Sequence, residues 1–280
     1  MSKKTHQQQL AARKAKRQAE RVAEQRRQRR NLTVTITAIV TVVVVVVGVF
    51  VVLGNGDDAS PAASAGPDNK PQSIPTALAA APKRATALPA EVTCTYKKGT
   101  EAASKKVNPP ADGKTKASGT SKVSLNTSIG DLQLTLDSSL APCAVKSFLS
   151  LVGQKFYDDT TCHRLTVGAG LQVLQCGDPT ATGGGGPGYS FADEVFPTLK
   201  YGRGVLAMAN SGPNTNGSQF FIVYGDGSGL SPDYTAFGTI DEPSLKLIDK
   251  VAEAGVTPQN GPTDGTPVTP VKIETATAAA

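Results

Sequence analysis

A run of 22 residues without a single charge, residues 32–53, most constrains what this 280-residue chain can fold into. The run reads LTVTITAIVTVVVVVVGVFVVL, and its many valines also suit a β-strand. A strand rarely exceeds about 10 residues, whereas a helix of this length extends about 33 Å and crosses a hydrocarbon core of about 30 Å. The sequence therefore predicts a transmembrane helix over residues 32–53, which would satisfy its own backbone hydrogen bonds in lipid.

The segment before this run, residues 1–31, is strongly basic. Residues 1–30 carry eleven Lys or Arg and two Glu, a local charge of +9, whereas the whole chain carries +6. Cations beside a span keep their side cytoplasmic, so we expect a single-pass protein of the cell membrane with an extracytoplasmic remainder. A cleaved signal peptide is the alternative, although its apolar region is usually only about 7–15 residues. An RNA-binding arm is the alternative for the tail, but an orientation signal touching anionic lipid is favoured and no nucleic-acid partner is expected.

A linker and lead-in, residues 54–120, follow the predicted span. Residues 54–90 are rich in Ala, Pro, Ser and Gly and show no hydrophobic period, which predicts a disordered tether. Residues 91–120 are also mostly polar. Cys94 and Tyr96 nevertheless indicate that part of this lead-in docks on the domain that follows.

Patterned sequence begins near Lys122. VSLNTSIGDLQLTL alternates apolar and polar residues around a turn at residues 129–131, which predicts a β-hairpin. SLAPCAVKSFLSLVGQKFY and EPSLKLIDKVAEAG predict two helices, the first beginning near Pro142, and TPVTPVKIETA predicts a closing strand. Many short strands without a βαβ rhythm indicate a mostly β fold, a closed antiparallel barrel.

The four cysteines are Cys94, Cys143, Cys162 and Cys176. An even number in an exported domain suits two disulfides, and three pairings are possible. We expect Cys143–Cys162 and Cys94–Cys176. Zinc is the alternative, but no CxxC spacing occurs and His163 is the only histidine outside the tail, so no metal or other cofactor is expected.

Two further motifs resemble enzyme sites only superficially. TGGGGPGY, residues 182–189, lacks the Lys-Ser/Thr ending of a phosphate-binding loop and no helix obviously follows, so it indicates a mobile loop. Ser218 is not part of a GxSxG elbow and has no His–Asp partner pattern, which argues against a hydrolase.

Residues 208–222, MANSGPNTNGSQFFI, closely resemble the signature of cyclophilins, the peptidyl-prolyl cis–trans isomerases. Four more motifs stand in the family's order: FYDDTTCHRL (156–165), LQCGDP (174–179), GPGYSFADE (186–194) and YTAFGTI (234–240). The resemblance covers residues 121–275 and implies a closed eight-stranded antiparallel barrel with two capping helices and a groove on its outer surface. The tail, span and linker look like those of membrane-anchored actinobacterial cyclophilins.

The resemblance also implies the roles of individual residues. Arg164 matches the catalytic arginine, and Gln175 and Gln219 match the glutamines that orient it and bind the substrate backbone. The positions that match substrate-binding residues are His163, Leu171, Gln172, Val173, Ala209, Asn210, Phe221, Leu230 and Tyr234. Phe220 lies on the opposite face of the same strand and is expected in the core.

One stretch departs from the family pattern. RLTVGAGLQVLQ is three residues longer than usual, and Leu171 or Gln172 stands where the family has an aromatic pocket residue. Two hypotheses follow for a domain expected to be monomeric. The first is an isomerase that acts on proline-containing polypeptides and assists the folding of exported proteins. The second is a cyclophilin-like binding module or chaperone with little turnover.

Overall fold

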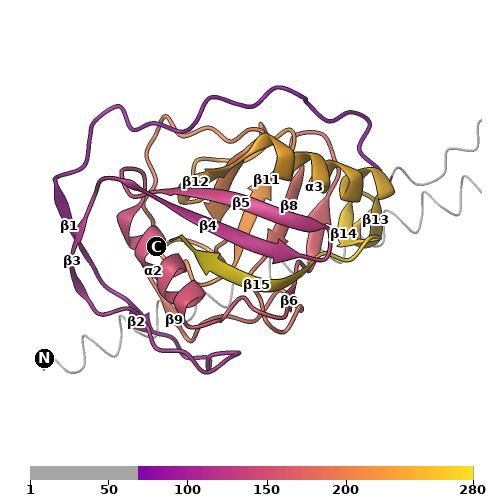
Figure 1. The fold of residues 1–280 in the computed structure, drawn as a ribbon. Coiled ribbons are helices and arrows are strands. Elements are labelled where there is room, and N and C mark those ends of the chain that lie inside the picture. The colour runs from indigo at the N-terminus through magenta and orange to yellow at the C-terminus, as the bar shows by residue number, and fades with distance from the viewer. Residues whose placement is uncertain (1–68, 280) are drawn as a thin grey trace, which may run out of the picture. The chain divides into compact units, whose positions relative to one another are not determined.

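The computed structural model describes residues 69–279 (Figure 1). The predicted basic tail, the predicted transmembrane helix and the first part of the linker lie outside these residues. Among the residues described, no helix is both long and apolar enough to cross a membrane. This part of the chain is mostly β and carries two α-helices, as the sequence predicts.

The main sheet has eleven strands in the order β13-β14-β7-β8-β11-β10-β12-β5-β4-β15-β6. Its strands along the chain are β4 (Thr120–Thr127), β5 (Gly130–Asp137), β6 (Thr160–Thr161), β7 (Arg164–Thr166), β8 (Val173–Cys176), β10 (Val205–Met208), β11 (Phe220–Val223), β12 (Ala236–Ile240), β13 (Val256–Gly261), β14 (Asp264–Pro267) and β15 (Lys272–Ala278). The predicted hairpin is confirmed as β4–β5, but its turn is formed by Ser128 and Ile129, since Gly130 and Asp131 already pair with Thr127 and Asn126. The predicted closing strand is confirmed as β15.

The sheet is not the closed eight-stranded barrel that the sequence predicts. Its hydrogen-bonded ladder ends at β13 and at β6, and no hydrogen bonds join these two end strands. Only Cys162 and His163 separate β6 from β7, so the strand beside β15 continues directly into the strand beside β8. The predicted strand count and closure were wrong, because β6 and β7 are two separate short strands and the hairpin β13–β14 adds two strands to the ladder.

Two helices pack on the sheet, α2 (Pro142–Gly153) and α3 (Glu242–Ala254) (Figure 1). Pro142 stands in the first turn of α2, as predicted, where a missing N–H costs no helical hydrogen bond. Asp241 caps α3 by accepting a hydrogen bond from the Ser244 N–H at 3.0 Å. Phe148 of α2 lies 5.2 Å from Phe220 and 4.8 Å from Tyr157, ring centre to ring centre, which confirms Phe220 as a core residue.

Glu194 holds the N-terminus of α2. Its two carboxylate oxygens accept hydrogen bonds from the N–H groups of Cys143 at 3.0 Å and Ala144 at 2.8 Å. Arg84 binds the main-chain oxygen of Glu194 at 2.7 Å. Burial raises the pKa of Glu194 to about 7, because desolvation outweighs these donors and the charge of Arg84.

Glu194 is therefore expected to make stability depend on pH. Its folded pKa of about 7 exceeds the ordinary value of 4.5, so the folded protein retains a proton between these values. The free energy of unfolding should consequently fall as the pH rises from about 4.5 through about 7, by roughly 3 kcal/mol in total. Urea denaturation of residues 65–280 from pH 4.5 to 8.5 measures this dependence.

The matched control is Glu194→Gln, which has no titrating group at this position. His163 acts in the opposite direction, because burial lowers its pKa and its contribution grows with rising pH. That contribution is present in both proteins, so the difference between the two curves isolates Glu194. A difference that stays constant across this pH range would contradict the prediction.

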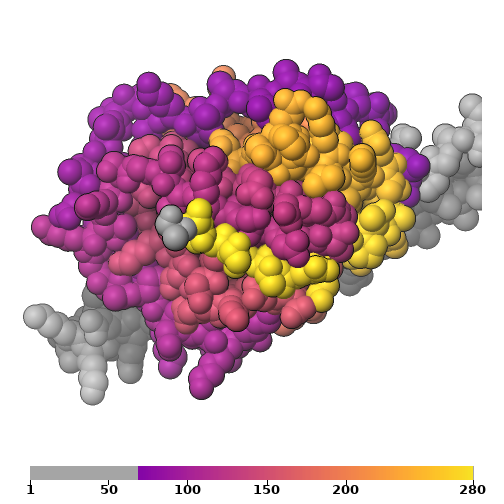
Figure 2. Space-filling view, in the orientation of Figure 1, coloured from indigo at the N-terminus to yellow at the C-terminus, as the bar shows by residue number. Residues whose placement is uncertain are grey.

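The linker from residue 69 onward and the lead-in, residues 91–120, are both ordered against the domain. The lead-in adds two small sheets, β1 (Glu91–Cys94) with β3 (Gly113–Lys116), and β2 (Lys97–Lys98) with β9 (Tyr189–Ser190). Figure 2 shows the indigo segment that begins at residue 69 lying on the upper edge of the domain surface. The prediction of a disordered tether was wrong for residues 69–90, because individual bonds pin them, such as Ala79 N–H to Arg203 O at 2.9 Å. The predicted docking at Cys94 and Tyr96 is confirmed, since both are buried.

All four cysteines form disulfides, but in a different pairing from the predicted one. The bonds are Cys94–Cys143, which ties the lead-in to α2, and Cys162–Cys176, which joins the two-residue link before β7 to the end of β8. Antiparallel pairing of β7 with β8 brings Cys162 and Cys176 together, so neither can reach the predicted partner. Within residues 69–279, no three His, Cys, Asp or Glu side chains gather so that they could hold a metal ion.

Candidate active site

The candidate active site begins with one row of residues across three neighbouring strands. Arg164 on β7 lies opposite Gln175 on β8, and Gln175 lies opposite Phe221 on β11. Directly opposed residues of an antiparallel pair project from the same face of the sheet. The row therefore projects from the opposite face of the strand to Phe220, and Phe221 itself is only 4% exposed.

A chain of hydrogen bonds fixes the polar side chains of this row. Arg164 Nη1 donates to Gln175 Oε1 at 3.0 Å, and Gln175 Nε2 donates to Gln219 Oε1 at 2.9 Å. Gln219 Nε2 then donates to the carbonyl oxygens of Gly183 at 2.9 Å and Gly185 at 3.0 Å. Each amide thus has its oxygen toward the arginine and its nitrogen toward the glycine loop, which sets both amide orientations. The structure brings the three predicted catalytic residues together.

Asp264 completes this chain at its other end. Its carboxylate binds the Arg164 side chain bidentately, with Nε to Oδ1 at 2.8 Å and Nη2 to Oδ2 at 2.7 Å. The hydrogen bond to Arg164 holds the pKa of Asp264 below its usual value, and the same bond raises the pKa of Arg164. Asp264 carries no signal of this role in the sequence, because next to a glycine it shows only the pattern of a turn residue.

Asp178 organises the glycine loop that receives Gln219. Its fully buried carboxylate accepts hydrogen bonds from the N–H groups of Thr180, Thr182, Gly183 and Gly185. Burial alone would raise the pKa of Asp178, but the hydrogen bonds from the Thr180 hydroxyl and from the N–H groups of Gly185, Thr180 and Gly183 lower it below the usual value. A Cβ at Gly185 would lie 1.9 Å from Asp178 Oδ1, so only glycine allows this approach. Asp178 also escaped the sequence analysis.

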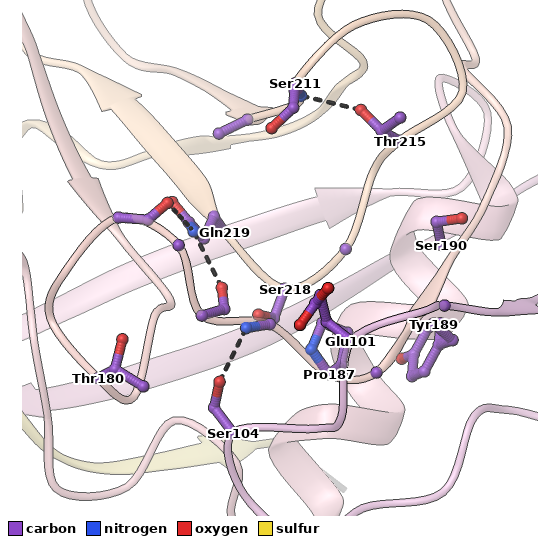
Figure 3. A pocket seen from close by; sticks show the side chains of 18 of the residues that line it. Glu101, Ser104, Thr180, Pro187, Tyr189, Ser190, Ser211, Thr215, Ser218 and Gln219 are labelled. Atoms are coloured by element: carbon purple, nitrogen blue, oxygen red, sulfur yellow. Dashed lines mark hydrogen bonds between the residues drawn. The ribbon is translucent and has the colours of Figure 1, made fainter.

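A pocket of 880 Å³ opens beside Gln175 and Gln219. The glycine loop and the segment 209–219 form part of its wall, and the lead-in contributes residues 99–102 and 104 (Figure 3). Ser104 Oγ accepts a hydrogen bond from the Gly186 N–H at 3.0 Å, which joins the lead-in to the glycine loop. A segment outside the recognised motifs therefore helps to shape the pocket.

Ala209 and Asn210, predicted to bind the substrate chain, both line this pocket. The Asn210 side chain donates to Asp233 O at 3.0 Å and accepts from the Gly212 N–H at 3.2 Å, so it also fixes its own loop. The Ala209 N–H donates to Gln219 O at 2.9 Å. The other two asparagines of this loop bind the segment 191–193, because Asn214 Oδ1 accepts from the Asp193 N–H and Asn216 Nδ2 donates to Asp193 Oδ1.

Two tyrosine side chains pack near Phe221. The Phe221 and Tyr234 rings lie 5.5 Å apart, edge to face, and Tyr201 lies 6.2 Å from Tyr234. The Tyr201 hydroxyl donates to Tyr234 O at 2.6 Å and accepts from the Tyr234 N–H at 2.9 Å. Tyr201 therefore fixes the backbone of a predicted pocket residue, a role the sequence analysis did not assign. Leu230 is half-buried against the same core.

The structure places the three predicted residues of the lengthened loop differently from one another. The Gln172 side chain is 3% exposed, donating to Ser73 O at 2.8 Å and accepting from the Asp226 N–H at 2.7 Å. Its amide is thus used inside the protein and is not open to a substrate. Val173 lies two residues from Gln175 on the same face of β8 and is 2% exposed, and Leu171 is half-buried.

His163 is also predicted to bind substrate, but its ring is buried. The side chain is 8% exposed, and neither ring nitrogen has a hydrogen-bond partner among the described residues. Burial lowers the pKa of His163, which favours a neutral imidazole. Its ring lies next to Gly183, beneath the glycine loop rather than in the Arg164 row.

An arginine–glutamine–glutamine chain beside aromatic side chains, on the outer face of a curved antiparallel sheet, is the arrangement that the motifs imply for a cyclophilin. The family model described as "Cyclophilin type peptidyl-prolyl cis-trans isomerase/CLD" matches residues 122–278. The chain therefore belongs to this family.

Several relatives agree with this assignment. The chain is 49% identical over 196 residues to "Probable peptidyl-prolyl cis-trans isomerase B" of Mycobacterium leprae, a match that spans 65% of each chain. It is 47% identical over 194 residues to the protein of the same name in Mycobacterium tuberculosis, covering 64% of this chain and 62% of that one. The chain thus matches slightly less than two thirds of the length of these relatives.

A crystal structure of a Cryptosporidium parvum cyclophilin-type peptidyl-prolyl cis–trans isomerase has a similar fold. The TM-score is 0.51 at 34% sequence identity, and the match covers 58% of this chain and 99% of that one. The fold of the described domain is therefore cyclophilin-like.

Proposed function

We propose that this chain is a peptidyl-prolyl cis–trans isomerase that acts on proline-containing segments of exported proteins and thereby assists their folding. The observation that carries this proposal is the Arg164 guanidinium, which is fixed on two sides and still one-third exposed, at 32% for the side chain. Arg164 lies in the same row as Phe221, whose ring packs against that of Tyr234. A hydrogen-bond donor beside an apolar surface suits the chemistry of the X-Pro bond.

The reaction requires rotation about a bond and no bond cleavage. Conjugation of the X-Pro amide sets a barrier of about 18–20 kcal/mol, so the uncatalysed flip takes tens to hundreds of seconds. As the bond twists, conjugation is lost, the prolyl nitrogen becomes pyramidal and it regains a lone pair. A donor that binds this lone pair stabilises the twisted state more than either planar state, which accelerates the reaction.

Arg164 provides that donor in the proposed mechanism. A guanidinium stays charged and offers five N–H groups in a plane, three of which Asp264 and Gln175 occupy. The remaining groups can donate to the prolyl nitrogen. Phe221, Tyr234 and Leu230 would contact the proline ring, and Gln219 with the segment 209–210 would bind the substrate backbone.

Binding with little turnover is the second candidate, and the lengthened loop favours it. Gln172 stands near the position of the family's pocket aromatic, and its side chain is turned into the protein. Weaker contact with the proline ring would reduce preferential binding of the twisted state.

A protease-coupled assay with a proline-containing peptide separates the two candidates. The full chain in mild detergent is expected to accelerate the cis-to-trans step in proportion to its concentration. Two-dimensional exchange NMR of the same peptide, without protease, provides an independent rate. Binding of the peptide without acceleration in either assay would favour the binding module.

We further propose that residues 32–53 anchor the protein in the cell membrane, with the N-terminus cytoplasmic and the isomerase domain outside. The charge-free run and the adjacent cations support the orientation, and two disulfides in the domain support an oxidising compartment. Protease treatment of intact bacterial cells that express the full chain should degrade the domain. Protection of the domain until the cells are lysed would contradict this orientation.

A further inference from the structure

The hairpin β13–β14 brings a carboxylate to Arg164 from far along the chain. Asp264 begins β14 and lies opposite Thr166 of β7, while Gly265 lies opposite Leu165. This pairing sets the carboxylate next to the guanidinium, 100 residues away in sequence. Asn260, in the same hairpin, donates to Asp264 Oδ1 at 3.4 Å, which is a weak further contact.

The contacts of Arg164 leave one end of its guanidinium available. Asp264 takes the Nε–H and one N–H of Nη2, and Gln175 takes one N–H of Nη1. Of the five donors, one on Nη1 and one on Nη2 remain without a partner among the described residues. A bidentate carboxylate fixes both the plane and the rotation of a guanidinium, whereas the single bond from Gln175 does not.

We infer that Asp264 is a positioning residue for Arg164, holding the guanidinium so that its free N–H groups point at the twisted prolyl nitrogen. The inference rests on the proposed isomerase function. Without Asp264 the long arginine side chain regains rotational freedom, and each turnover has to select the productive rotamer again. The arginine can contact substrate without Asp264, but it would do so in the right orientation less often.

A purely structural ion pair is the alternative explanation. The Arg164 and Asp264 side chains are 32% and 20% exposed, and ion pairs this close to solvent contribute little to stability. A structural role predicts lower thermal stability with unchanged turnover of the folded protein. A positioning role predicts lower kcat with nearly unchanged KM, because the lost interaction belongs to the transition state.

The test compares Asp264→Ala, Asp264→Asn and Asp264→Glu with the wild type, each as the full chain in mild detergent. We expect kcat/KM to fall about 10- to 100-fold in the Ala and Asn variants, mostly through kcat. The Glu variant keeps a bidentate acceptor on a longer side chain and should recover part of the loss. Circular dichroism verifies that each variant is folded at the assay temperature, and the Asn variant, which keeps the side-chain shape, covers the case in which Ala does not fold.

Glu242→Ala is the matched control, because Glu242 forms an exposed ion pair with Lys246 on α3 at 2.9 Å, remote in sequence from both residues. Its kcat should equal that of the wild type. The inference would be overturned if folded Asp264→Ala or Asp264→Asn had the kcat of the wild type. It would also be overturned if Glu242→Ala lost as much kcat as the Asp264 variants.

A second measurement does not depend on catalysis. The Arg164 Nε–H NMR signal should be protected from solvent exchange in the wild type and exchange faster in Asp264→Ala. An unchanged Arg164 signal would overturn the inference whatever the activity. If the wild type lacks isomerase activity but the signal responds to Asp264→Ala, the proposed function fails while the ion pair itself is verified.

Discussion

Replacing Arg164 by alanine is expected to lower kcat/KM for X-Pro isomerisation about 100- to 1,000-fold, the loss usual for a donor that binds charge developing in the transition state. Most of the change should appear in kcat, because the lone pair on the prolyl nitrogen exists only in the twisted state. The protease-coupled assay and exchange NMR both measure it. The Phe221 and Gln219 contacts remain, so peptide binding should change much less than turnover.

Two controls separate this effect from a loss of charge. Arg164→Lys keeps the positive charge but cannot bind Asp264 and Gln175 together through a planar fork, so it should also lose most of the activity. Lys246→Ala removes an exposed cation on α3 and should leave turnover unchanged. Equal activity in the wild type and Arg164→Ala would rule out the proposed mechanism, even if the protein still binds proline peptides.

Local patterns predicted five elements of the fold individually. The β4–β5 hairpin, both helices and the strand β15 follow from apolar periodicity, a turn signal and Pro142, all of which act over a few residues. The wrong predictions depend on long-range geometry. The hydrogen-bonded ladder ends at β13 and β6, and which strands stand at its two ends depends on pairings between segments far apart in the sequence.

In the candidate site, too, residues within the motifs could be predicted from the sequence, whereas partners from distant segments could not. Motif positions brought Arg164, Gln175 and Gln219 into one hydrogen-bonded chain, because these residues lie on adjacent strands and the loop next to them. Asp264 and Tyr201 reach the site from other segments, and only the register of β14 with β7 and the packing of Tyr201 on Tyr234 reveal them. Side-chain type alone cannot indicate such partners.

The cysteine pairing and the linker show a second limit. Composition correctly favoured disulfides, but the choice among three pairings depends on strand neighbours. Composition also predicted disorder over residues 54–90, whereas a few specific bonds are enough to order the part from residue 69 onward. Arg84 is an example, since it binds Leu140 O at 2.9 Å and stacks on the Phe196 ring at 4.8 Å.

Removal of the Cys94–Cys143 disulfide is the second large expected effect. Its cysteines are separated by 49 residues, and a cross-link that closes a loop of that length stabilises the folded state by about 4 kcal/mol in the chain-entropy account. The double variant Cys94→Ala/Cys143→Ala should lose about this much free energy of unfolding. Urea denaturation of residues 65–280, followed by far-UV circular dichroism, measures it, since the chain has no Trp to report by fluorescence.

The matched variant is Cys162→Ala/Cys176→Ala, whose bond spans only 14 residues and should contribute about 3 kcal/mol. For activity we expect the opposite order, with a larger loss of kcat in the Cys162→Ala/Cys176→Ala variant. Cys162 lies two residues before Arg164 and Cys176 directly follows Gln175, so their loss should lower kcat. The Cys94–Cys143 bond instead fixes the lead-in, which contributes residues 99–102 and 104 to the pocket wall. A stability loss below about 1 kcal/mol in the Cys94 variant would show that the hydrogen bonds and the buried Tyr96 ring hold the lead-in without the disulfide.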